Sequence, residues 1–121
     1  MANGFVHIEL NTTDPKAAKS FYGQLFNWQL EDMDMGGGGT YTIIRPGEGP
    51  GGGMMQHPMP GAPSMWLTYI NVDDLKASTE KARTLGAQVL RDATEVPNMG
   101  SFSILSDPTG AVFALWQAKT K

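Results

Sequence analysis

The chain has 121 residues and a mass of 13.1 kDa, the size of one domain with a single core and no separate substrate domain. Nine basic residues against twelve acidic ones give a net charge of −3, and the basic residues are scattered, so we expect no nucleic-acid binding. The apolar runs are too short to span a membrane, no secretory leader is recognisable, and there is no cysteine. These features predict a cytoplasmic protein without disulfides.

The N-terminal half begins with a strand followed by a helix. Residues 4–11 alternate between two faces, with His7 and Glu9 on the same one. Asp14 is a suitable N-cap, and the apolar positions that follow it have helical spacing, which predicts a helix over residues 14–26. Three further strands are expected at residues 28–33, 40–45 and 52–56.

The C-terminal half repeats this order. When the chain is shifted by 60 residues, Asn71 falls on Asn11 and Asp74 falls on Asp14. Gly86 is placed to end the second helix in a left-handed conformation. The repeat predicts one domain with a first module over about 4–57, a proline-rich linker at 58–64 and a second module over about 65–118. Within the second module we expect a strand at 65–72, a helix at 74–86, and strands at 88–93, 101–106 and 111–117.

Glycine-rich segments punctuate the first module. Gly36–Gly39 and Gly47–Gly53 carry neither a Lys-Ser nor a Lys-Thr ending and do not open a helix, so phosphate binding is not expected. We interpret them as hairpin connections. In the closing strands, the glycines align Gly52–Gln56 with Gly110–Ala114.

Several motifs resemble one known family over nearly the whole chain. They are His7-Ile8-Glu9-Leu10, Asp14, Phe21-Tyr22, Val72-Asp73-Asp74, Leu85-Gly86 and Ser106-Asp107-Pro108-Thr109-Gly110. This pattern resembles the vicinal-oxygen-chelate superfamily of glyoxalases, bleomycin-resistance proteins and dioxygenases. The resemblance implies an α+β fold of two tandem βαβββ modules, in which a curved eight-stranded mixed sheet forms a cup with the helices outside. The chain looks most similar to the uncharacterised glyoxalase-like, hydroxylase-related group through Trp66-Leu67-Thr68-Tyr69, Val96-Pro97-Asn98-Met99-Gly100 and Phe113-Ala114-Leu115-Trp116-Gln117.

The resemblance also implies metal-ligand positions on the first and last strand of each module. These positions hold His7 and Gln56 in the first module and Leu67 and Ala114 in the second. Two of the four side chains have no donor atom, whereas catalytic divalent sites generally use three protein ligands. We therefore expect no metal and no other cofactor; His7 and Gln56 would be the ligands if a metal were bound. A rebuilt site of His7, Glu9 and His57 is the alternative.

Alternation along the strands also predicts which side chains line the cup. The predicted ligand-binding residues are His7, Glu9, Met54, Gln56, Leu67, Tyr69, Ala114 and Trp116. Three interpretations of His7 stay open: a structural residue hydrogen-bonded to a neighbour such as Glu9 or Gln56, a donor that orients a ligand, or a base in proton transfer. His7 and Glu9 are accordingly the only catalytic candidates.

The leading functional hypothesis is metal-independent binding, or processing, of a small organic molecule in the cup. The alternatives are a metal-dependent lyase, isomerase or dioxygenase of the glyoxalase type, and an interaction module without a ligand. A homodimer is expected, because a short chain with open sheets leaves edges and apolar surface to cover.

Overall fold

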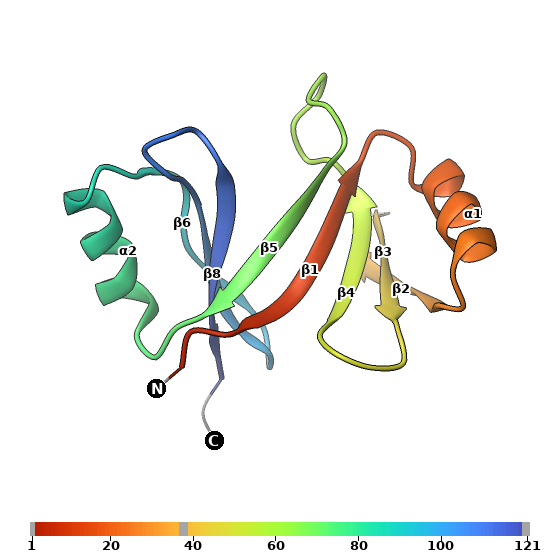
Figure 1. Cartoon of the computed structure of the whole chain (residues 1–121), viewed down its shortest axis with the longest axis horizontal. Coiled ribbons are helices and arrows are strands. Elements are labelled where there is room, and N and C mark those ends of the chain that lie inside the picture. Colours follow the sequence, from red (N-terminus) through yellow and green to blue (C-terminus); the bar gives the residue numbers. More distant parts are fainter. Residues whose placement is uncertain (1, 37–38, 120–121) are drawn as a thin grey trace. The chain divides into compact units, whose positions relative to one another are not determined.

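The structure is a computed structural model that describes residues 2–36 and 39–119. Within these residues two helices and eight strands follow in the order β–α–β–β–β, twice over (Figure 1). This order confirms the predicted α+β fold, with each helix at its predicted place. The centre of the predicted glycine hairpin, residues 37–38, lies outside the described residues. The elements are β1 (Phe5–Thr12), α1 (Pro15–Leu25), β2 (Gln29–Gly36), β3 (Gly39–Arg45), β4 (Gly51–Gln56), β5 (Met65–Asn71), α2 (Leu75–Thr84), β6 (Gln88–Val96), β7 (Gly100–Ser106) and β8 (Val112–Ala118).

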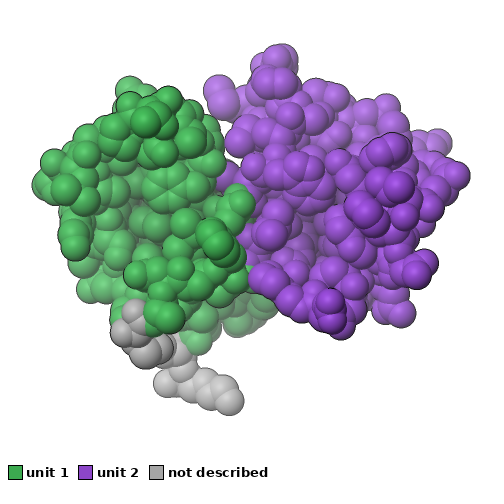
Figure 2. All heavy atoms as spheres, in the orientation of Figure 1, with its two compact units in different colours: residues 1–6, 68–121 green, residues 7–67 purple. Residues whose placement is uncertain are grey.

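The chain divides into two compact units (Figure 2). Unit 2 comprises residues 7–67. Unit 1 comprises residues 1–6 together with 68–121. Each unit contains one helix and the greater part of four strands, and each is described by itself below.

Unit 2 has the strand order β2-β3-β4-β1, in which β1 pairs with β4 in parallel and the other neighbours are antiparallel. Leu10, Ile44 and Met54 form the buried core, and Ala18 and Tyr22 of α1 pack against them. Each such side chain contributes about 1.5–3 kcal/mol when fully buried. Met54 has no exposed surface and lies in this core, so it is not on the same sheet face as His7. The prediction that Met54 lines the ligand site is therefore wrong.

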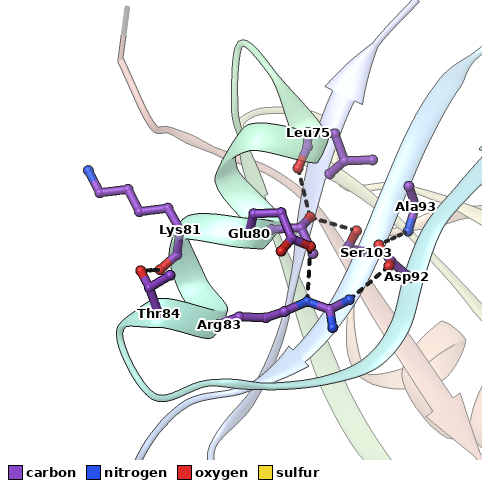
Figure 3. Close-up of polar contacts among 9 residues, drawn as sticks. Leu75, Glu80, Lys81, Arg83, Thr84, Asp92, Ala93 and Ser103 are labelled. Atoms are coloured by element: carbon purple, nitrogen blue, oxygen red, sulfur yellow. Dashed lines mark hydrogen bonds and ion pairs between the residues drawn. The ribbon is translucent and has the colours of Figure 1, made fainter.

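Unit 1 has the order β5-β8-β7-β6, with β5 and β8 parallel. Leu75 of α2 packs on Leu105 and Leu115 of the sheet. Beside this core the Thr79 hydroxyl donates to the Leu75 carbonyl at 2.7 Å and lies 2.9 Å from the Ser103 hydroxyl (Figure 3). Both hydroxyl-bearing residues are buried, so this pair satisfies polar groups that burial would otherwise destabilise.

In each unit an aspartate N-cap and a glutamine at the end of the closing strand bind the backbone at or just before the start of the helix. Asp14 accepts a hydrogen bond from Ala17 N and Asp74 accepts one from Ala77 N, both at 3.1 Å, as expected for N-caps. At the end of β4, Gln56 Nε2 donates to the Thr13 carbonyl at 3.3 Å. At the corresponding end of β8, Gln117 Oε1 accepts from Leu75 N at 2.7 Å.

The strand register corrects the sequence alignment of the closing strands. Glu9 lies opposite Gly53, and Tyr69, its counterpart in the repeat, lies opposite Ala114. Gly53 therefore corresponds to Ala114, and Gln56 corresponds to Gln117. The predicted alignment of Gln56 with Ala114 is wrong by three residues. The predicted alignment paired the glycines of β4 with Gly110, but these glycines are not equivalent. Gly110 occupies a left-handed turn conformation with φ of 98°, whereas Gly53 lies inside a strand.

Candidate functional site

A chain of hydrogen-bonded polar side chains lies on the unit 2 sheet face opposite α1. His7 Nε2 lies 2.7 Å from Tyr41 Oη, and Tyr41 Oη donates to Glu9 Oε1 at 3.0 Å. Asn11 Nδ2 donates to the other oxygen, Glu9 Oε2, at 2.9 Å. Glu9 and Asn11 are buried and His7 is half-buried. The four side chains therefore form one connected network.

Local sequence places these groups together. His7, Glu9 and Asn11 alternate along β1 and so share one face. Tyr41 comes from β3, which is not next to β1, because β4 lies between them. Strands are about 4.8 Å apart, so the tyrosine must reach across the whole width of β4. It does so over Gly53, where an added Cβ atom would overlap the phenol ring. The absence of a side chain at Gly53 thus leaves room for the Tyr41 ring to cross β4.

The hydrogen-bond directions fix the tautomer of the histidine. The hydroxyl hydrogen of Tyr41 is directed to Glu9, so the Tyr41 oxygen accepts from His7 Nε2–H. In the neutral ring, Nδ1 then carries the lone pair. Burial lowers the pKa of His7 from its usual 6.5, and the Glu9 carboxylate opposes this by a smaller amount. The environment of His7 therefore favours the neutral form of its ring.

The structure brings His7 and Glu9 together through Tyr41, but not His7 and Gln56. Gln56 lies opposite Thr12, five residues along β1 from His7, which is about 16 Å at the rise of a strand. Its side chain is exposed and braces the loop before α1. His57 lies at the same end of β1, since its amide donates to the Thr12 carbonyl, and its Nδ1 accepts from Met59 N at 3.1 Å.

The remaining predicted residues are apolar or aromatic. Leu67 of unit 2 is 1% exposed, and Ala114 of unit 1 has no exposed surface. In unit 1, Tyr69 makes edge contacts with Trp116 and Phe102, at centroid distances of 6.4 and 6.1 Å. Tyr69 and Trp116 thus belong to one aromatic group, on the sheet face opposite α2.

The donor set does not fit the divalent metal that the superfamily resemblance implies. In the second module the predicted ligand positions carry the hydrocarbon side chains of Leu67 and Ala114. In the first module Gln56 lies far along the strand from His7, and Gly53, the true counterpart of Ala114, has no side chain. In residues 2–36 and 39–119, no three His, Cys, Asp or Glu side chains gather as a cluster able to hold an ion.

Sequence reasoning missed Tyr41, Asn11, Gly53 and Phe102. Tyr41 and Phe102 occupy equivalent positions in the repeat, on β3 and β7. Alternation along β3 and β7 predicts that Tyr41 lies on the face of His7 and that Phe102 lies on the face of Trp116. No pattern in the sequence indicates that the Tyr41 ring would cross β4.

Fold and family comparisons agree on what kind of protein this is. The doubled βαβββ order is that of a glyoxalase-like domain. The Glyoxalase/Bleomycin resistance protein/Dioxygenase superfamily matches residues 4–115, and the chain belongs to this superfamily.

Three individual proteins illustrate its relatives. The chain is 37% identical over 107 residues to the Mycobacterium tuberculosis protein CFP32, whose name describes a glyoxylase, covering 88% of this chain and 41% of that protein. It is 31% identical over 127 residues to the anthracycline biosynthesis protein DnrV of Streptomyces peucetius, covering 91% and 45%. The chain thus spans less than half the length of these two relatives. Among solved structures, methylmalonyl-CoA epimerase from Mycobacterium tuberculosis superposes with a TM-score of 0.70 at 15% identity, covering 97% and 89%; this likeness shows the fold.

Neither α1 nor α2 is long and apolar enough to cross a membrane, and these are the helices of the described residues.

Proposed function

We propose that this domain binds a small organic molecule without a metal ion, on the unit 2 sheet face that carries His7, Glu9 and Tyr41. The observation that supports it is the hydrogen-bonded network of these side chains. It lies opposite the helix-covered core, so its polar groups contribute nothing to apolar packing there. Small-molecule sites combine apolar walls with a few fixed polar groups, and the network supplies such groups.

The network also favours a particular kind of ligand. Tyr41 and Asn11 are oriented toward Glu9, and His7 is held in one tautomer. A ligand with a hydroxyl, amide or acid group suits a face that carries an imidazole, a phenol and a carboxylate as hydrogen-bonding groups. Tyr69, Ala114 and Trp116 lie on the face of unit 1 opposite α2, and we propose them separately as apolar contacts for a ligand bound to that unit. Leu67 is proposed as an apolar contact within unit 2.

Metal independence is proposed from the chemistry of the side chains. Tyr41 already engages both His7 and Glu9, and a metal bound by those two residues would have to displace the phenol from between them. The carboxylate is further held by Asn11. Removing metal from the protein is therefore expected to leave ligand affinity unchanged.

Thermal unfolding of EDTA-treated protein against a panel of small hydroxy, keto and carboxylic compounds tests this proposal. A ligand at a hundredfold excess over its dissociation constant stabilises the native state by about 2.7 kcal/mol, which raises the melting temperature by several degrees. Tyr41→Phe should weaken the response to any compound found. Lys16→Gln, at an exposed position of α1 on the other side of the unit 2 sheet, should not. Stabilisation that appears only after a divalent cation is added, or that no compound produces, contradicts the proposal.

A second candidate function is proton transfer at a carbon acid. The specific observation is that His7 is linked through Tyr41 to the Glu9 carboxylate, which would stabilise the imidazolium formed when the histidine accepts a proton. Methylmalonyl-CoA epimerase, named among the structural neighbours, makes this class of reaction worth testing. A bound ligand incubated in D₂O should lose its exchangeable C–H signal, and His7→Gln should abolish that loss. Binding without exchange would leave only the binding function.

A further inference from the structure

The orientation of Arg91 in unit 1 depends on two irregularities of β6. Val89 lies opposite Leu105, so regular pairing would place Arg91 opposite Ser103, on the face that α2 covers. A register shift between Val89 and Arg91 instead places Arg91 opposite Ile104. Because a shift of one residue reverses the face of every following side chain, Arg91 emerges on the face opposite α2.

A second register shift, between Arg91 and Thr94, places Thr94 on the same sheet face as Arg91. Thr94 lies opposite Phe102, and its hydroxyl accepts a hydrogen bond from Arg91 Nε at 3.2 Å. The Thr94 hydroxyl in turn donates to the Asp92 carbonyl at 2.9 Å. The two shifts therefore hold the guanidinium at a defined place above the sheet.

That place is an aromatic surface. The Arg91 guanidinium carbon lies 5.6 Å from the centroid of the Phe102 ring, within the range of a cation–π contact. Phe102 lies opposite Trp116 on β8, and Tyr69 contacts both rings at their edges. Phe102 and Trp116 are half-buried, so their rings remain partly accessible. We call Arg91, Phe102, Trp116 and Tyr69 the aromatic platform.

The charge of Arg91 has no carboxylate partner among the described residues. The nearest acid in sequence, Asp92, pairs with Arg83 of α2 at 2.8 Å instead, as Figure 3 shows. Glu95 lies opposite Ser101 and so belongs to the α2 side of the sheet. Among the described strand residues that the register places on the platform face, Arg91 alone is charged. Within the described residues, the two terminal nitrogens of Arg91 take part in no ion pair or hydrogen bond.

We propose that the aromatic platform of unit 1 binds a planar aromatic carboxylate, with the ring on Phe102 and Trp116 and the carboxylate on the two terminal nitrogens of Arg91. A guanidinium stacked on an aromatic face keeps its in-plane N–H groups available, and these match the two oxygens of a carboxylate. The hydrogen bond from Arg91 Nε to the Thr94 hydroxyl holds the guanidinium in a fixed orientation for the carboxylate. The inference rests on the proposed small-molecule binding and names the ligand class.

NMR titration with 2-naphthoate and its neutral analogue 2-naphthamide tests the proposal, because the two probes differ in charge and share the ring. Wild-type protein should bind naphthoate about tenfold more tightly, a factor equal to about 1.4 kcal/mol, with shifts at the amides of Thr94, Phe102 and Trp116. Arg91→Gln should reduce this preference to less than about twofold while leaving naphthamide binding unchanged. Phe102→Leu should weaken both probes. Lys81→Gln, which removes the same charge from an exposed position on α2, should change neither.

The outcomes separate this inference from the proposed function. Equal affinity for the two probes, unchanged affinity in Arg91→Gln, or no naphthoate binding at millimolar concentration would each overturn the carboxylate platform. Any of these results together with a stabilising compound in the metal-free panel would leave small-molecule binding intact.

Discussion

Removal of the Tyr41 hydroxyl is expected to destabilise the fold substantially. Tyr41→Phe deletes one hydrogen bond with His7 and one to the buried Glu9 carboxylate, at 2.7 and 3.0 Å. A neutral hydrogen bond contributes about 0.5–1.5 kcal/mol and one to a charged group about 1.5–3 kcal/mol, so we expect a loss of about 2–4 kcal/mol. Asn11 continues to bind Glu9, which keeps the loss from being larger. Urea denaturation measures it, as a lower midpoint at unchanged slope.

A double-mutant cycle with Gly53→Ala tests the geometric reason. The Cβ added at Gly53 would overlap the phenol ring, so the ring must leave its position and both hydrogen bonds are lost. In the Gly53→Ala background, Tyr41→Phe should therefore cost less than about 0.5 kcal/mol, which gives a large coupling energy. Gly51→Ala, on the same strand and the same face, is the control and should be neutral. Additive effects of Tyr41→Phe and Gly53→Ala would refute the idea that the ring crosses β4 over Gly53.

Three further predictions concern pH, the buried hydroxyl pair and assembly. The lowered pKa of His7 means that the unfolded chain binds the proton more readily, so stability should fall as pH drops below the usual value of 6.5, and His7→Gln should flatten that dependence in urea titrations. Thr79→Val leaves the Ser103 hydroxyl without its acceptor and should cost about 1–3 kcal/mol, whereas the double variant with Ser103→Ala should recover part of the loss; an unimproved double variant would contradict this. Light scattering should give twice 13.1 kDa, because Phe21 and Leu25 of α1 remain exposed; the mass of a single chain would refute the dimer.

The order of elements could be predicted because each depends on local signals. Asp14 and Asp74 precede apolar positions at helical spacing, and both act as N-caps in the structure. Gly86 has a φ of 104°, the left-handed conformation expected at the end of α2. The alternation along β1 also correctly placed His7 and Glu9 on one face.

The site was harder to predict because it depends on pairing between distant strands. The position of Gln56 relative to His7 follows from the parallel register of β4 on β1, and matching glycines could not supply that register. Arg91 shows the same limit, since alternation from Val89 would have placed it on the α2 side. Only the register shift in β6 reverses it, and no residue type in that segment marks the shift.

The path of the Tyr41 ring across β4 has a kinetic consequence. The β2-β3 and β3-β4 pairs join neighbours in sequence, whereas β1 pairs with β4 only after residues 13–50 have been enclosed. Such a long loop closes slowly, so β1 is expected to dock late in folding. The His7–Tyr41 hydrogen bond cannot exist before that step. Tyr41→Phe should therefore accelerate unfolding and leave the folding rate nearly unchanged, and the ring would hold the finished unit closed without helping it to form.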